Sequence, residues 1–441
     1  MGKYLFWPLL VFLIASGLLL SEILPVMAGV ETDDRSFQFN GYMQTDNSFD
    51  IKNDYQESWY EYRLGLNAEA KTGAKTHIFT EFWIRSFKDS EDDYNFDLRE
   101  AYLDWYGFLT DRSDLRIGRQ RIAWGVGDKL NPTDNLNPDD FENIWDFGRH
   151  LESDAVKVSY YPGEYTVTGV IIPEFTPAVL PADDSVSWLA PPELPPGTTL
   201  ENQTTTEITP SNNRENFIYG IKIARNIRGY DFSVSYIRGR DDLPVARKVE
   251  LTPGPRGINI NSELIYPKTD IFGFDLSGAI GNVGIWAETA LFCPEEVILV
   301  TDSTSLGMGL QESVALDDDP YIKYLIGMDY TFGNGFYLNV QYLHGFPYER
   351  GENLEDYLVF RLESKFKNET LIIPLNLCYE IKDTDDLKNN SAVVFAPEIV
   401  FRPGNNTEYT FGVRLIDGAD TTTFGRMKDK DHIYFKLKFS F

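Results

Sequence analysis

Seven charged residues between positions 116 and 140 form the part of this chain best suited to act on other molecules. They are Arg116, Arg119, Arg121, Asp128, Asp134, Asp139 and Asp140. Opposite charges that face each other across a narrow opening create a local field, and such constrictions sort solutes by size and charge. The pattern therefore predicts selection of a dissolved molecule without any bond being made or broken.

Bond-making chemistry finds little support elsewhere in the chain. None of the four histidines lies near a Ser or Cys nucleophile motif, and no Gly-x-Ser-x-Gly sequence occurs. The two cysteines lie far apart, and the runs of Asp and Asn do not fit a calcium-binding loop. We therefore predict no catalytic residues, no metal ligands and no cofactor. A net charge of −28 argues against a nucleic-acid partner, and the acidic runs are expected at solvated loop tips.

The elements that would position these residues are strands. Residues 432–441 alternate without a break, with Ile433, Phe435, Leu437, Phe439 and Phe441 on one side and polar or mixed residues on the other. A period of two with one wholly apolar face is typical of a strand whose outer surface meets an apolar environment. A terminal Phe on such a strand predicts the closing strand of a membrane β-barrel, which the barrel-assembly machinery would recognise.

Similar segments repeat along the chain and predict an all-β fold. We expect about 18 strands, with 16 as an alternative, in a single transmembrane antiparallel β-barrel. The segments are 36–47, 55–71, 75–88, 97–109, 113–122, 153–161, 164–173, 215–227, 230–240, 270–281, 283–293, 321–332, 336–346, 353–367, 369–382, 391–402, 406–417 and 431–441. Short connections rich in Gly, Asn, Asp and Pro alternate with long ones, which predicts short periplasmic turns and long external loops. Aromatic residues also gather beside the short turns, as at a lipid–water interface.

The N-terminus predicts export. Residues 1–28 have a positive start, an apolar stretch and small residues before a cleavage site after Ala28, as in a secretory signal peptide. An uncleaved membrane anchor is the alternative. Residues 29–441 are then one barrel domain, in which 174–214 form a long, irregular external loop rich in Pro and Thr. The expected location is the outer membrane of a Gram-negative bacterium, with its lipid as a partner.

The segment 116–140 resembles a family. Its pattern Arg-x-Gly-Arg-Gln, Trp-Gly, Asp and Asn-Pro-x-Asp is similar to that of porin-like outer-membrane barrels of Gram-negative bacteria, namely the DUF1302-like group and, more distantly, alginate-export-type barrels. The matching residues are Arg116, Gly118, Arg119, Gln120, Trp124, Gly125, Asp128, Asn137, Pro138 and Asp140. The resemblance implies that residues 123–152 fold into the lumen and narrow it.

The positions of Arg119 and Arg121 along the predicted strand conflict with an inward orientation of their side chains. Arg119 and Arg121 share parity with Leu115 and Ile117, so on a plain strand they would face lipid at considerable cost. A bulge at Gly118 or the end of the strand would turn them inward. We expect residues 123–152 to form the constriction, and an ordered cap that holds the barrel rim is the alternative.

Further charged residues are expected to line the lumen. They are Glu61, Arg63, Glu81, Arg85, Glu100, Asp104, Arg361, Glu363, Arg402 and Arg414. Both signs are present, which predicts a wet interior, although paired charges also stabilise barrel walls. The favoured function is a channel for small hydrophilic solutes. The alternatives are a substrate-specific transporter or exporter of a polysaccharide or an apolar compound, and a barrel enzyme or non-conducting scaffold.

Overall fold

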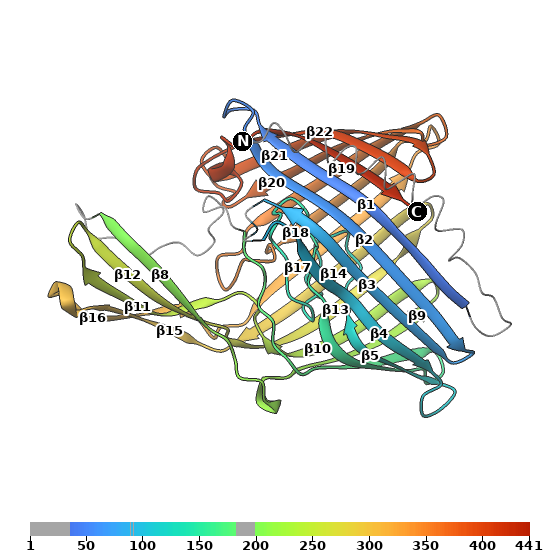
Figure 1. Ribbon diagram of the computed structural model, residues 1–441, viewed down its shortest axis with the longest axis horizontal. Helices are drawn as coiled ribbons and strands as arrows, with labels where there is room; N and C mark the ends of the chain where they lie inside the picture. The colour runs from blue at the N-terminus through green and yellow to red at the C-terminus, as the bar shows by residue number, and fades with distance from the viewer. Residues whose placement is uncertain (1–35, 89, 91, 182–198) are drawn as a thin grey trace.

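A closed β-barrel dominates the structure, a computed structural model that describes residues 36–441 except 89, 91 and 182–198. The predicted signal peptide, residues 1–28, lies outside the described residues. Eighteen strands form the barrel (Figure 1). They are β1 (Ser36–Asp50), β2 (Glu57–Gly73), β3 (Thr76–Phe87), β4 (Asn95–Tyr106), β5 (Ser113–Gln120), β6 (Ser153–Tyr160), β7 (Tyr165–Ile172), β9 (Ile218–Ile227), β10 (Tyr230–Arg240), β13 (Lys268–Ile280), β14 (Val283–Pro294), β17 (Tyr321–Thr331), β18 (Tyr337–His344), β19 (Asp356–Phe366), β20 (Leu371–Ile381), β21 (Ser391–Gly404), β22 (Thr407–Gly418) and β23 (His432–Ser440).

The barrel closes because β1 pairs with both β2 and β23. Residues 42–50 of β1 are antiparallel to residues 432–440 of β23, with Gln44 opposite Lys438. Every other barrel strand pairs with its neighbours in chain order, always antiparallel. The predicted barrel of 18 strands is therefore confirmed, and the alternative of 16 is wrong.

Turns and loops are sorted to opposite ends of the barrel. The tight turns gather at one end and the long connections at the other, which is the left end in Figure 1. Between β9 and β10, Arg228 and Gly229 both have positive φ, as a two-residue type I′ turn requires, and the Asn226 side chain accepts from Gly229 N. This turn chemistry is what made the hairpins predictable.

The outer face of the barrel is apolar. On β17 the side chains of Ile322, Ile326 and Met328 are about half exposed, while Lys323 and Leu325, which have the opposite parity, are almost fully buried. Such alternation turns one apolar row of side chains outward, as the terminal segment predicted, while the inward row mixes polar and apolar residues. Among the described residues, no helix is long and apolar enough to cross a membrane.

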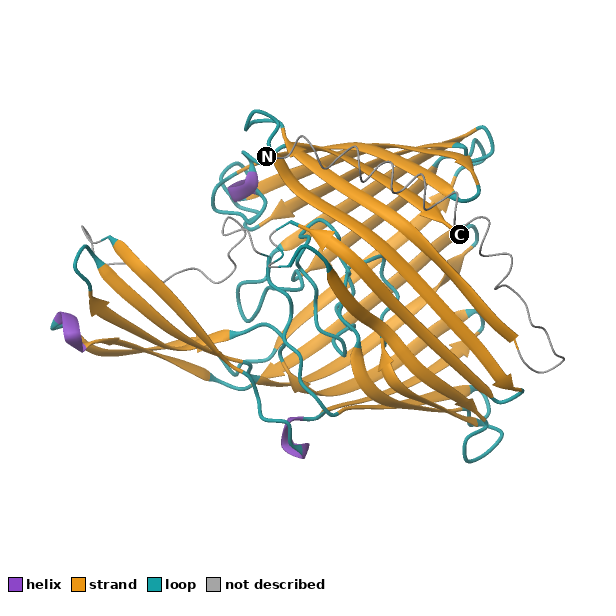
Figure 2. Ribbon diagram, viewed as in Figure 1, coloured by secondary structure: helices purple, strands orange, loops and turns teal. Residues whose placement is uncertain are grey.

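A second sheet of five strands projects from the end that carries the long connections (Figure 1). Its strand order is β16, β15, β11, β12, β8, and its bounds are β8 (Leu200–Ile208), β11 (Val245–Pro253), β12 (Ile258–Ile265), β15 (Val297–Ser303) and β16 (Gly309–Leu316). Three one-turn helices, η2 (Arg214–Asn216), η3 (Thr304–Leu306) and η4 (Gly425–Met427), lie in the connections of this end (Figure 2).

The sequence assigned these five strands to loops. The expectation of an irregular connection is wrong for residues 200–208, which pair in parallel with β12. Strand β8 is exposed along its whole length, and its polar residues, including three consecutive threonines, leave no apolar face by which a strand could be predicted. Long-range pairing to residues 258–265, rather than local pattern, makes this segment extended.

Candidate functional site

The loop between β5 and β6, residues 121–152, fills much of the barrel interior, and Asn137 fixes its two ends together. The Asn137 side-chain oxygen accepts from Ile122 N at 2.6 Å and from Arg121 Nη1 at 3.1 Å. Its nitrogen donates to Gln120 O at 3.2 Å and to Ser153 Oγ at 3.1 Å. The Asn137 side-chain amide thus joins the end of β5, the loop and the start of β6. This role accounts for the asparagine of the Asn-Pro-x-Asp pattern.

Arg121 and Asp134 lie side by side within the loop rather than on opposite sides of an opening. Their side chains form an ion pair, and Asp134 Oδ1 also accepts from Trp124 N at 3.0 Å. Because β5 ends at Gln120, Arg121 is released from strand parity and turns inward. The end of the strand, one of the two predicted devices, therefore operates here.

Arg116 and Arg119 do not join this pair. Arg116 faces inward and donates to both oxygens of Asp104, at 2.7 and 3.0 Å, with its guanidinium 3.7 Å from the ring centroid of Tyr102. Arg119 keeps the outer parity of Ile117, and its Nε donates to Leu98 O at 2.9 Å. The expectation that Arg119 turns inward is wrong, because β5 pairs without a bulge through Gly118 on both sides.

The remaining aspartates of the pattern are held by other groups. Asp140 pairs with Arg149 at 2.7 Å, and Asp139 lies 3.2 Å from His150 Nδ1. Asp128 contacts the wall through its backbone, whose N–H donates to Gln341 of β18 at 3.1 Å. Opposing rows of arginines and aspartates across an opening are therefore not present among these seven residues, since most of them are already paired.

Two acids near the loop are unusual in their protonation. Burial raises the pKa of Asp139 to about 7, and burial together with the charges of Asp139 and Asp241 raises the pKa of Asp242 to about 7. The Asp139 N–H donates to Asp242 Oδ2 at 2.6 Å, which brings the two carboxyl groups close. Burial lowers the pKa of the neighbouring His150. The two carboxyl groups of Asp139 and Asp242 therefore change charge near neutral pH.

The far wall holds the loop through Glu288 of β14. This carboxylate, 2% exposed, accepts from Val126 N and Gly127 N, and Thr133 Oγ1 lies 2.9 Å from it. Gly125 has a φ of +109°, and a Cβ there would lie 3.0 Å from the Glu288 carboxylate. The Trp-Gly step of the pattern thus allows the backbone to approach a buried acid.

Apolar and charged contacts fill the rest of the interior on three sides. Trp124 and Leu136 pack against inward-facing aliphatic residues of β7, β9, β10 and β13, and Leu130 packs in a second cluster against β17 and β18. Arg149 completes a charged cluster with Glu61 and Glu142 beside β2 and β3. The loop therefore packs against the barrel wall on three sides.

A cavity remains on the fourth side. It measures about 380 Å³ and lies between residues 142–145 of the loop and strands β1, β22 and β23, with the first residues of β2 also in its lining. Its lining includes Asp46, Trp145, Arg414, His432 and Lys436. We call it the passage cavity.

Both charge signs and three aromatic rings, of Trp59, Trp145 and Tyr434, line the passage cavity together with His432. Lys436 pairs with Asp46 at 2.8 Å, and the guanidinium of Arg414 lies 4.3 Å from the Trp145 ring centroid. His432 Nε2 lies 2.6 Å from Arg414 Nη1, while His432 Nδ1 lies 3.0 Å from Lys430 O. These two contacts fit a neutral imidazole that donates through Nδ1 and accepts through Nε2.

Most of the predicted lumen residues are paired along the wall. Glu61 pairs with Arg63 at 2.6 Å, Arg85 with Asp97 and Glu142, and Arg361 with Glu363 at 2.5 Å. Glu81 accepts from Trp83 Nε1 at 2.8 Å, and Glu100 accepts from Arg121 N at 2.9 Å. Arg402 pairs with Glu408 at 2.7 Å near a tight turn, where both side chains are exposed. Of the predicted set, Arg414 alone lines the passage cavity.

Sequence reasoning missed Glu142, Trp145 and Asp46, which face the passage cavity from opposite sides. Glu142 and Trp145 come after the Asn-Pro-x-Asp pattern in the sequence. The folded path of the loop, which no local pattern predicts, brings them close to β1 and β23. A Trp in a loop otherwise rich in Asn and Asp was the one available signal, because aromatic side chains seek a packing partner.

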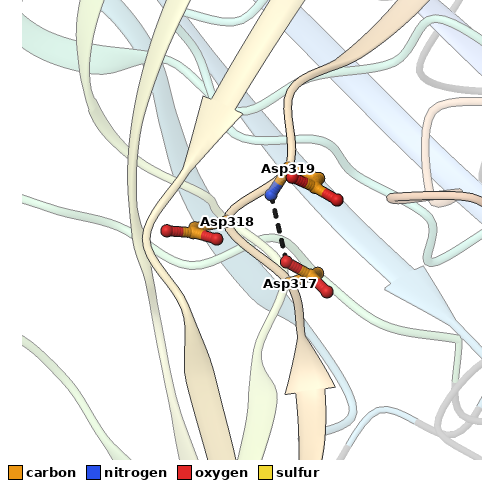
Figure 3. A group of neighbouring side chains, drawn as sticks. All are labelled: Asp317, Asp318 and Asp319. Carbon is orange, nitrogen blue, oxygen red and sulfur yellow. Dashed lines mark hydrogen bonds between the residues drawn. The ribbon is translucent and has the colours of Figure 1, made fainter.

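Three adjacent acids, Asp317, Asp318 and Asp319, lie in the connection between β16 and β17 (Figure 3). Asp319 N donates to Asp317 Oδ1 at 3.2 Å, and all three side chains are exposed. The hydrogen bond closes a local Asx turn, which explains the arrangement without a cation.

No protein-family model and no curated protein sequence matches the chain. The resemblance to DUF1302-like barrels therefore stays a prediction. Among solved structures, OmpF of Salmonella typhi in complex with daunomycin is similar at 10% identity and a TM-score of 0.43, covering 93% of this chain and 99% of that chain. A loop-deletion mutant of OmpT, an outer-membrane protein of Vibrio cholerae, is similar at 12% identity and a TM-score of 0.43, covering 93% and 100%. A triple mutant of the Rhodopseudomonas blastica porin is similar at 9% identity and a TM-score of 0.43, covering 92% and 100%. At these values the comparisons carry no argument on function, and the barrel assignment depends on the strand pairing itself.

Proposed function

We propose that the chain is an outer-membrane channel through which small hydrophilic solutes pass the tip of the 121–152 loop. Its outer-membrane lipid is the surrounding partner, and the apolar exterior of the strands supports this placement. The exported form would reach the membrane through a cleaved signal peptide and the barrel-assembly machinery.

The passage cavity is the observation that carries the proposal. The loop packs against the wall on three sides, and a space of about 380 Å³ with both charge signs in its lining stays between its tip and β1, β22, β23 and the start of β2. A barrel of this strand number leaves a wide bore unless something fills it, so the loop determines where solutes can pass. The constriction we propose is thus formed by Trp145 and Glu142 against Asp46, Lys436 and Arg414, rather than by Arg116 and Arg119.

Planar-bilayer recording with cysteine variants tests both the activity and the route. Ser48 of β1 lines the passage cavity, whereas Ser233 of β10 faces inward on a packed side, and the two are similarly buried at 8% and 7% exposed. A cationic methanethiosulfonate reagent should lower the conductance of Ser48→Cys and leave Ser233→Cys unchanged. Unmodified protein treated in parallel accounts for Cys293 and Cys378.

Two outcomes of these recordings would contradict the proposal. A purified barrel that inserts but never conducts is a scaffold, and the channel proposal fails. A channel whose conductance falls in Ser233→Cys but not in Ser48→Cys conducts by another route, and the passage cavity is then wrong.

A further inference from the structure

A second and larger cavity lies outside the bore, between the five-stranded sheet and the rim of the barrel. It measures about 1,330 Å³ and is lined by all five strands of that sheet, by residues 243–246 and by residues 348–355. We call it the vestibule. Pro181 lines both the vestibule and the passage cavity, so the two spaces adjoin.

One wall of the vestibule is aliphatic. It is formed by Val245 and Val249 of β11, Leu264 of β12, Leu299 of β15 and Val314 of β16. Val249 and Leu264 are buried within the sheet, at 3% and 5% exposed, whereas Val314 is 53% exposed and offers the free apolar surface. Apolar surface that stays in contact with water is unfavourable by about 25 cal/mol per Å², so a solute with an apolar body gains by covering it.

The charged groups of the vestibule are almost all acidic. The acids that line it are Glu207, Asp317, Asp319, Glu349, Glu352 and Glu355, and Arg350 is the one basic side chain among the described lining residues. Arg350 is already held by both oxygens of Asp241. The space therefore has a negative potential, which concentrates cations and repels anions.

We propose that the vestibule binds small organic cations that carry an apolar body, before they enter the passage cavity. The position of this step in a transport route rests on the proposed function, whereas the binding itself does not. An inorganic cation would gain nothing from the aliphatic wall, and a neutral apolar solute would gain nothing from the acids. An ammonium group on an apolar body uses both.

Equilibrium dialysis of tetrabutylammonium against the full chain in lipid nanodiscs tests the charge part at low ionic strength, where surface charges act over a longer range. The variant Asp317→Asn/Asp319→Asn/Glu352→Gln removes three exposed acids of the vestibule. Its affinity should fall roughly tenfold, since exposed charges contribute modestly and three are lost together.

The matched control is Asp383→Asn/Asp385→Asn/Asp386→Asn. These acids lie in the external connection 382–390, outside the vestibule lining, and Asp385 N donates to Asp383 Oδ1 as Asp319 N does to Asp317 Oδ1. Each triple variant removes three negative charges, so the net charge of the chain changes by the same amount in both. The control should keep its affinity to within about twofold, because screening weakens distant surface charges.

The apolar part is tested on β16. Val314→Asn should weaken tetrabutylammonium several-fold and leave the smaller tetramethylammonium unchanged. Leu310→Asn serves as control, because Leu310 lies on the same strand, is 64% exposed and does not line the vestibule.

Three results would overturn the inference: no saturable binding by the unmodified chain, equal losses in the two triple variants, or equal losses in Val314→Asn and Leu310→Asn. Dialysis needs no conduction. Binding that follows the expected pattern in a barrel without conductance therefore supports the vestibule while the channel proposal fails.

Discussion

The guanidinium of Arg414 lies 4.3 Å from the centre of the Trp145 ring, so a wall residue of β22 and the tip of the 121–152 loop meet beside the passage cavity. Cation–π contacts of this kind contribute about 0.5–2 kcal/mol. Trp145 also stacks on Phe424 at 6.3 Å between centroids, which ties the tip to the external connection 419–431.

Replacing Trp145 by Ala should widen the passage. The ring fills space between the loop and the wall, and its loss should raise single-channel conductance and cost about 1–3 kcal/mol of stability, because the side chain is only partly buried. Trp105→Ala, on the outer face at 42% exposure, is the control and should conduct as the unmodified chain does. A conductance equal to that of the control would contradict the assigned constriction.

Replacing Asn137 by Ala should loosen the whole loop. Four hydrogen bonds are lost, each worth about 0.5–1.5 kcal/mol, so urea unfolding in detergent should show a loss of roughly 2–6 kcal/mol. Asn135→Ala provides the comparison, because its side chain donates a single bond to Pro132 O. If the two variants lose equal stability, Asn137 does not hold the loop ends.

Replacing Gly125 by Ala should destabilise the contact with Glu288. The new Cβ meets the carboxylate at 3.0 Å, and a φ of +109° is strained for any residue with a side chain. We expect a thermal midpoint several degrees lower and noisier current in the open channel. Gly169→Ala in β7 should change neither, since a Cβ at Gly169 has no heavy atom within 4 Å.

Stability should fall as pH rises from about 4 to about 7. The folded-state pKa of Asp139 and of Asp242 is raised to about 7, so the folded chain binds more protons than the unfolded chain in that window. Glu152, whose pKa burial also raises to about 7, acts in the same direction, whereas His150, with a lowered pKa, opposes it below about 6.5. The surrounding charges are Arg121, Asp134, Asp241, Lys323 and Arg350.

Thermal unfolding at pH 5 and pH 8 measures this dependence. The drop between them should amount to at least about 1.4 kcal/mol, the value of one pKa unit, and Asp139→Asn should reduce it. Asp386→Asn, an exposed acid of another loop, should leave it intact. An Asp139→Asn variant with an unchanged pH profile would exclude this carboxyl as its source.

The barrel could be predicted because its signals are local. The apolar parity of Ile433 to Phe441 and the Arg228-Gly229 turn each depend on a few consecutive residues, and repetition of such patterns fixed the strand number. The orientation of Arg119 was predicted wrongly because it depends on the exact residue at which the strand ends. Strand β5 ends at Gln120, so Arg121 lies beyond the strand and turns inward, whereas Arg119 lies within it and faces outward.

The site depended on contacts that no local pattern contains. Trp145 reaches the passage cavity only because Glu288 and Asn137 hold the loop across the bore, and these residues are distant in sequence. The five-stranded sheet was missed for the same reason, since β8 has no apolar face and pairs with residues 57–58 positions later.

The pairing of β1 with β23 has a consequence for assembly. Strands β1 and β23, with their neighbours β2 and β22, also line the passage cavity. The contact joins residues 42–50 to 432–440, and such distant pairings form late because the chain entropy they cost is large. In the channel proposed above, a half-assembled intermediate would therefore have a gap where the folded barrel has the passage cavity, and a passage of defined size would exist only after β1 pairs with β23.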